Sequence, residues 1–136
     1  SAPYLGGGFG HFFSYAPKPE IEYCINRFSM ETKRQLDVLD QQLAKGKYIC
    51  GDTYTLADIS IWPWYGALAL GNLYTGSDKF LDVASYKNLM RWSHMMEEEN
   101  MAVRKGRMVN RSWGDDKTNP LYKDIPALKE RHGRED

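Results

Sequence analysis

The 136-residue sequence predicts an all-α fold. The first observation behind this prediction is that apolar residues recur at steps of three and four, which places them on one face of a helix. The second is that no segment shows the sustained alternation of polar and apolar residues that is typical of a half-buried strand. The third is a sharp helix-start signal at residues 55–58. A chain of this length fits one domain.

Residues 1–18 are rich in glycine, proline and aromatic residues, and they are predicted to form an ordered loop. Glycine in a helix interior costs about 1 kcal/mol relative to alanine, so a helix is not expected here. The segment is also too aromatic for a disordered linker. The run from Gly6 to Gly10 has two interpretations, a turn that requires positive φ or a loop that lets a substrate approach the backbone.

Residues 19–114 are predicted to form the helical bundle. Its first long helix should start near Pro19 or Glu20, because proline is tolerated in a first turn and an acid suits the positive end of the helix dipole. Gly46 is the expected C-cap of this helix. The stripe of apolar residues that should be buried consists of Ile21, Ile25, Phe28, Leu36, Leu39 and Leu43.

The second helix has the clearest start signal. Thr55 fits an N-cap and Asp58 follows three residues later, which is the spacing of a capping box. Residues 59–70 are apolar on nearly all faces, so this helix should lie in the centre of the bundle, with a kink at Pro63.

Two further helices complete the predicted bundle. The third should run from about Ser85 to Glu98, with Ser85 as a plausible cap. The fourth should cover about Met101–Val109. Residues 115–136 are expected to be a mostly irregular, charged tail, with a possible helical turn at 127–131.

Composition limits the functions that the chain can have. Eighteen basic residues balance eighteen acidic ones, so charge gives no reason to expect nucleic acid or a membrane as partner. The longest apolar stretch is too short to span a bilayer. Cys24 and Cys50 have no metal-ligand spacing, and two lone thiols favour a reducing compartment, here the cytoplasm. Cys24 is expected to be buried and inert, and Cys50 to be more exposed.

Residues 51–59 (GDTYTLADI) resemble the capped core helix of the glutathione transferase C-terminal domain. Similarity to the bacterial nu class of that family is closer still. It extends over residues 3–12 (PYLGGGFGHF), 21–28 (IEYCINRF), 61–66 (IWPWYG) and 104–111 (RKGRMVNR). The resemblance covers nearly the whole chain and weakens after Asp115.

The resemblance implies a domain of a glutathione-dependent disulfide reductase with modest transferase activity. In such enzymes a thioredoxin-like N-terminal domain holds glutathione and activates its sulfur. The helical C-terminal domain forms a wall of the second-substrate pocket and much of a homodimer interface. The thioredoxin-like pattern is absent from these 136 residues, so we expect the chain alone to be inactive and assign it no catalytic residue and no metal. The alternative is a non-catalytic interaction module, a role that helical domains of this type also have in translation factors and synthetases.

The resemblance also assigns one glutathione contact. An arginine on the helix after the glycine-rich segment contacts a glutathione carboxylate in the nu class, and it matches Arg27. The alternative for Arg27 is an ordinary surface pair with Glu31, four residues later. His11, Phe12 and Tyr15 could line a pocket for an apolar or disulfide substrate, anchor the segment to the core, or face the missing domain.

Overall fold

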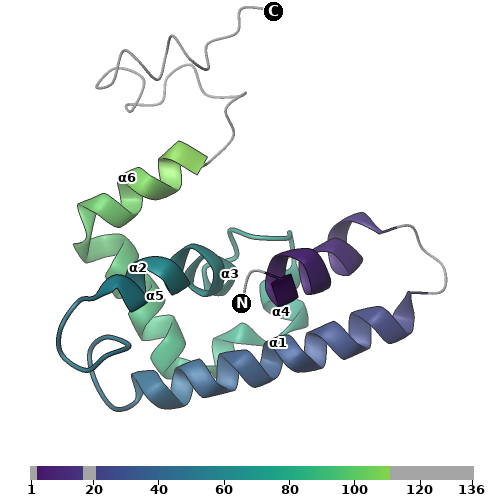
Figure 1. Ribbon diagram of the computed structural model, residues 1–136, viewed down its shortest axis with the longest axis horizontal. Helices are drawn as coiled ribbons and strands as arrows, with labels where there is room; N and C mark the ends of the chain where they lie inside the picture. The colour runs from purple at the N-terminus through teal and green to yellow at the C-terminus, as the bar shows by residue number, and fades with distance from the viewer. Residues whose placement is uncertain (1–2, 17–20, 111–136) are drawn as a thin grey trace, which may run out of the picture. The chain divides into compact units, whose positions relative to one another are not determined.

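The structure is a computed structural model that describes residues 3–16 and 21–110. Within these residues every regular element is helical and a lone bridge joins Tyr48 and Gly51, so the all-α prediction is confirmed (Figure 1). The elements are η1 (Pro3–Tyr15), α1 (Glu22–Leu43), α2 (Leu56–Ile61), η2 (Trp62–Gly66), α3 (Ala67–Ala69), α4 (Ser77–Phe80), η3 (Val83–Ser85), α5 (Lys87–Glu99) and α6 (Met101–Asn110).

The chain forms two compact units, Ser1–Met96 and Glu97–Asp136. This boundary falls inside the stretch 19–114 that the sequence predicts as one bundle. The predicted tail at 115–136, with its possible helical turn, lies outside the described residues. Within the described part, no helix is both long and apolar enough to cross a membrane.

The segment predicted as a loop is instead a π-helix, η1. The amide of Ala16 donates to the carbonyl of His11 at 2.9 Å, which is the five-residue step of this helix type. Leu5 and Phe9 are fully buried, so η1 is packed against the rest of the first unit. The prediction of a loop is wrong because Gly6, Gly8 and Gly10 are placed against aromatic rings, and this packing outweighs their low helix propensity.

Helix α1 buries one stripe of side chains, which includes Thr32, Leu36, Leu39 and Leu43. These residues follow one another at steps of four, three and four, as a single helical face requires. The helix ends at Ala44, so the prediction of Gly46 as C-cap is wrong.

Gly46 has a different role from the one predicted. A Cβ added to Gly46 would lie 2.8 Å from the Cα of Gly51, closer than real contacts. A side chain at Gly46 would therefore push apart the two backbone segments of this turn. The small residue is needed for close approach and not for capping.

Helix α2 starts as predicted, with a complete capping box formed by Thr55 and Asp58. The turns that follow change to a π-helix at Trp62, immediately before Pro63. The buried residues of the run 59–70 are Trp62 and the stretch from Tyr65 to Ala69. The first turn is not central, because Leu56 is 77% exposed.

Helices α1 and α5 cap each other. Asp40 of α1 accepts a hydrogen bond of 2.8 Å from the amide of Leu89 in the first turn of α5. Arg91 of α5 donates to the carbonyl of Leu43, the last residue of α1, at 2.8 Å. Ser85 is therefore not the cap of α5, and its hydroxyl donates to a carbonyl within its own turn. Each helix satisfies terminal groups that the other would leave unpaired.

The second unit contains α6, which confirms the fourth predicted helix. The side-chain oxygen of Asn100 accepts hydrogen bonds from the amides of Ala102 at 3.0 Å and Val103 at 3.3 Å. Asparagine is a favoured N-cap residue, so this helix starts on a local signal.

Candidate functional site

The glycines of η1 bring its backbone against three aromatic rings. A Cβ on Gly8 would overlap the ring of Phe28 on α1, and a Cβ on Gly10 would overlap the ring of Tyr74. The positive-φ glycines of the described residues lie elsewhere in the chain. The turn interpretation of this segment is therefore wrong, and the groups that approach its backbone are side chains of the same chain.

Contacts between aromatic rings hold η1 against the rest of the first unit. Phe9 is fully buried and its ring centroid lies 5.1 Å from that of Phe13. Phe9 also stacks on Phe80 at 6.3 Å and meets Tyr74 edge-on at 6.2 Å. Each such pair contributes about 0.5–1.5 kcal/mol beyond its buried area. The side chains that η1 exposes are thus held on a rigid support.

The structure places the predicted pocket residues in two groups. His11 is exposed and meets Phe12 edge-on at 5.3 Å, while Phe12 stacks on Phe28 at 5.4 Å. Tyr15 is 72% exposed and instead contacts Tyr74, at 6.4 Å.

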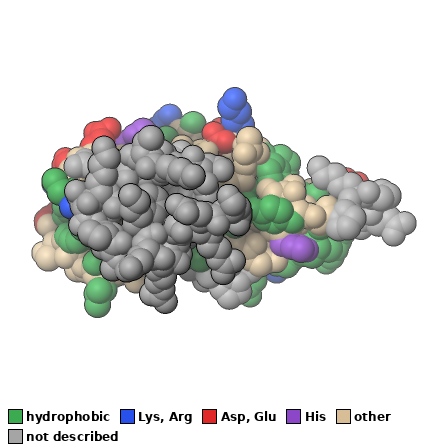
Figure 2. Space-filling view, turned by 90° about the horizontal axis from the view of Figure 1, so that it is seen from above, with side chains coloured by type: hydrophobic (Ala, Val, Ile, Leu, Met, Phe, Trp, Pro, Cys, Tyr) green, Lys and Arg blue, Asp and Glu red, His purple; other side chains and the backbone are tan. Residues whose placement is uncertain are grey.

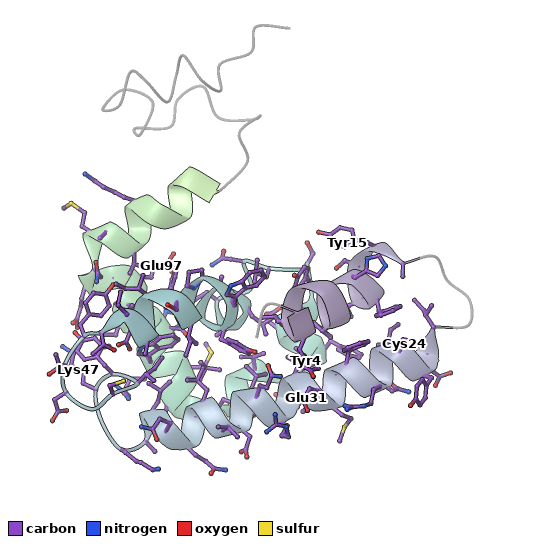
Figure 3. All side chains as sticks on the ribbon, viewed as in Figure 1. Tyr4, Tyr15, Cys24, Glu31, Lys47 and Glu97 are labelled. Carbon is purple, nitrogen blue, oxygen red and sulfur yellow. The ribbon has the colours of Figure 1, made fainter. Side chains whose placement is uncertain are left out.

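The figures show where these two groups lie. Tyr15 projects from the side of η1 that faces away from α1 (Figure 3). Apolar side chains (green) are exposed on the face of the molecule that Figure 2 shows. Phe12 is thus partly an anchor on α1, whereas His11 and Tyr15 are open to a ligand.

Arg27 lies on the first half of α1, directly before Phe28, the residue on which η1 rests. Its side chain is exposed, and it has no hydrogen-bond partner among the described residues. Arg27 therefore carries an exposed positive charge on the residue directly before the ring that supports η1. The surface pair with Glu31, the alternative interpretation of Arg27, does not form a hydrogen bond in the described structure.

Glu31 instead forms hydrogen bonds with residues on its C-terminal side along α1. Arg34 donates to both Glu31 oxygens, at 2.6 and 2.9 Å, and the amide of Gln35 donates at 2.8 Å. These hydrogen bonds, with that from Arg34 the largest cause, lower the pKa of Glu31 to about 2. Tyr4 of η1 lies close enough to Arg34 to help raise the pKa of that arginine, after Glu31 as the main cause (Figure 3).

The polar network on α1 continues into the core. The hydroxyl of Tyr65, a buried residue of η2, donates a hydrogen bond to the side-chain oxygen of Gln35. Burial raises the pKa of Tyr65 to about 12. The phenol is therefore a neutral donor at physiological pH, and Gln35 is oriented by a rigid partner.

Sequence reasoning missed Phe28 and Tyr74 as supports of the site. Tyr74 has φ 46°, a left-handed conformation that is uncommon for a bulky residue, and it lies between Gly71 and Gly76, which also have positive φ. The two flanking glycines are the sequence signal for this turn. Nothing local indicates that the ring in the turn packs on Gly10, because that contact spans 64 positions.

The structure also shows the environment of the two cysteines. Cys24 is half-buried and Cys50 exposed, and both are free thiols. Cys24 is therefore less buried than the sequence predicts, whereas Cys50 is exposed as expected. The part of the chain that the structure describes contains no group of three histidine, cysteine or acidic residues that could hold a metal ion.

Comparison with known proteins places this fold in a family. Residues 22–94 match the family described as "Glutathione S-transferase, C-terminal domain". The sequence is 52% identical to the disulfide-bond oxidoreductase YghU of Escherichia coli (strain K12), over all of this chain and 43% of YghU. It is 56% identical to an uncharacterised GST-like protein of Streptococcus mutans over 72% of the chain and 37% of that protein.

A solved structure is similar in both sequence and fold. It is the glutathione transferase YghU from Streptococcus pneumoniae ATCC 700669, complexed with glutathione, with 58% identity and a TM-score of 0.75. The alignment covers 82% of this chain and 42% of that one. The chain thus spans well under half of the relatives it matches.

These matches define an all-helical C-terminal domain of the glutathione S-transferase family, and the chain belongs to that family. Within it, the chain is a homologue of the YghU-type, nu-class disulfide-bond oxidoreductases at 52–58% identity. The resemblance drawn from the sequence is therefore confirmed.

Proposed function

We propose that this chain supplies one contact to glutathione and one wall of the second-substrate pocket in a glutathione-dependent disulfide oxidoreductase. The observation that carries the proposal is Arg27, an exposed guanidinium with no described hydrogen-bond partner, one residue before Phe28, whose ring packs on η1. The glutathione in the related YghU structure supports the choice of ligand. The activity belongs to the longer protein, and the chain alone would be inactive.

The chemistry of the two partners suits this role. Glutathione carries two carboxylates, and a planar guanidinium binds a carboxylate through two parallel hydrogen bonds. Arg27 would anchor one end of the tripeptide in this way. Its contribution is to binding and orientation, so it is a binding residue and not a catalytic one.

His11, Phe12 and Tyr15 would form the pocket wall on the η1 side. The edges and faces of their rings offer contact area at low entropic cost, which suits an apolar or disulfide substrate. None of the three has an acid or nucleophile partner in the described residues, so we assign them no proton-transfer role.

The proposal includes a homodimer, the commonest symmetric assembly. Three side chains at steps of seven and eight residues along α1 are well exposed, namely Tyr23, Met30 and Val38. Such a stripe is apolar surface that a partner could cover. Two free thiols agree with a reducing compartment, in which reduced glutathione is available.

The test is glutathione binding, measured by calorimetry on the full-length protein that contains this chain. Arg27→Ala should weaken binding by about 1.5–3 kcal/mol, the range for a hydrogen bond to a charged group. Lys45→Ala is the matched control, because it removes an exposed cation just beyond the C-terminal end of α1, whereas Arg27 lies in the first half of that helix. Unchanged affinity in Arg27→Ala would remove this residue from the site and favour the interaction module.

A further inference from the structure

Two arginines on α1 compete for one carboxylate. Arg27 lies four residues before Glu31, and Arg34 lies three residues after it. Both spacings bring side chains together on a helix, and an acid that follows a base by four residues is the weaker orientation. The other neighbours of Arg27 at three and four residues are Tyr23, Cys24 and Met30, so Glu31 is its one acidic competitor on the helix.

The structure resolves this competition in favour of Arg34. Its Nε and one terminal nitrogen donate to the two oxygens of Glu31, in the bidentate arrangement that strengthens arginine–carboxylate pairs. The third donor is the amide nitrogen of Gln35, at 2.8 Å. Glu31 is therefore held by residues on its C-terminal side, and Arg27 influences it electrostatically without a hydrogen bond.

The orientation of Gln35 is fixed from the core. A carboxylate can only accept hydrogen bonds, so the amide nitrogen of Gln35 must face Glu31 and its oxygen must face away. That oxygen accepts from the hydroxyl of Tyr65, which is 4% exposed. The side chain of Glu31 is itself 15% exposed, whereas that of Arg34 is 64% exposed. The hydrogen-bond network thus begins at the buried Tyr65 and ends at the solvent-exposed Arg34.

We propose that Arg34 is a positioning residue that, with Gln35 and Tyr65 behind it, holds Glu31 away from Arg27. The guanidinium of Arg27 then stays available for the carboxylate of a ligand. This inference rests on the role proposed above for Arg27. It adds that the availability of Arg27 depends on three residues that do not touch the ligand.

Without this network Glu31 would act as an internal inhibitor. Its carboxylate would form the (i, i+4) pair with Arg27 and occupy the donors that the ligand needs. An apparent dissociation constant rises in inverse proportion to the fraction of protein that is competent to bind. A surface helix pair of ordinary strength would therefore weaken ligand binding about two- to threefold.

The experiment measures glutathione affinity by calorimetry on the full-length protein. Arg34→Gln should raise the dissociation constant about two- to threefold, because Glu31 is released to Arg27. The double variant Arg34→Gln/Glu31→Gln should return to the wild-type value, since the competitor is gone and the net charge is restored. A purely structural role of Arg34, or a direct effect of its charge on the ligand, would not give this rescue.

The matched control is Gln41→Ala. It breaks an exposed (i, i+4) hydrogen bond to Asp37 on the same helix, and it should leave affinity unchanged. Loss of affinity in Arg34→Gln that persists in the double variant would overturn the inference, as would wild-type affinity in Arg34→Gln. In either case a weakened Arg27→Ala would leave the proposed function standing, whereas an unchanged Arg27→Ala would remove both.

Discussion

At the scale of single residues, the glycines of η1 differ in what they do. A Cβ on Gly8 would overlap the Phe28 ring, whereas a Cβ on Gly7 would meet nothing within 4 Å. The two positions are adjacent in one helix and share its backbone conformation. Substitution at each therefore separates the effect of packing from the effect of helix propensity.

Gly7→Ala should stabilise the protein by about 0.5–1 kcal/mol, because alanine restricts the unfolded chain and favours the helix. Gly8→Ala gains the same propensity but must displace the Phe28 ring, and overpacking of this kind typically costs about 1–3 kcal/mol. Urea denaturation should therefore show midpoints that move in opposite directions. Equal midpoints for the two variants would mean that Phe28 moves aside freely and does not support η1.

The sequence could predict Arg27 only as one of two possibilities. Spacings of three and four residues both allow a pair on a helix, so Glu31 could be assigned to either arginine. The choice depends on Gln35 and on Tyr65, which is 30 residues away from Gln35 in the chain. The pairing of Glu31 with Arg34 depends on the hydroxyl of Tyr65, so the sequence around Glu31 alone does not predict it.

At the scale of elements, Asp58 joins three parts of the first unit. It is fully buried, and its carboxylate accepts hydrogen bonds from the amides of Thr55 and Ile49 at 3.0 and 3.1 Å. It also accepts from the indole nitrogen of Trp92 on α5, at 3.0 Å. The capping residue of α2 thus also connects that helix to the preceding turn and to α5.

This arrangement predicts unequal costs for the two members of the capping box. Thr55→Ala should destabilise the protein by about 1 kcal/mol through loss of the cap. Asp58→Ala should cost at least about 3 kcal/mol, since it leaves three nitrogen donors without their partner. Chemical denaturation of both variants gives the comparison. Similar losses would show that water replaces the carboxylate at no cost.

Elements could be predicted from sequence where their signals are local. The capping box of α2 and the asparagine cap of α6 lie within three residues of the groups they satisfy, and both helices start where expected. The helix η1 could not be predicted, because its glycines argue against a helix until Phe28 and Tyr74 are known to pack on them. The start of α5 is set by Asp40, 49 residues before Leu89.

At the scale of the molecule, the capping contacts that stabilise the first unit and the proposed binding residue Arg27 lie in different halves of α1. The mutual caps with α5 involve Asp40 and Leu43 near the C-terminal end of the helix. Arg27 lies 13 residues before Asp40, about 20 Å along the axis. A variant at Asp40 should therefore lower the stability of the protein without moving Arg27. Its glutathione affinity should stay at the wild-type value.

Stability should also depend on pH through tyrosines of the first unit. Burial is the main cause that raises the pKa of Tyr65 to about 12, and it raises the pKa values of Tyr74 and Tyr86 as well. In the unfolded chain these phenols lose their protons near pH 10. The unfolded state then binds fewer protons than the folded state, so stability is constant below this value and falls as the pH rises above it.

The measurement is the urea midpoint between pH 8 and pH 11.5, for the wild type and for Tyr65→Phe. A single tyrosine can contribute a slope of at most about 1.4 kcal/mol per pH unit, so three perturbed groups give a clear alkaline decline. Tyr65→Phe loses the bond to Gln35 and should start lower at pH 8, but its decline above pH 10 should be shallower. Slopes that are parallel would show that Tyr65 titrates alike in both states, which is incompatible with a buried hydroxyl that donates to Gln35.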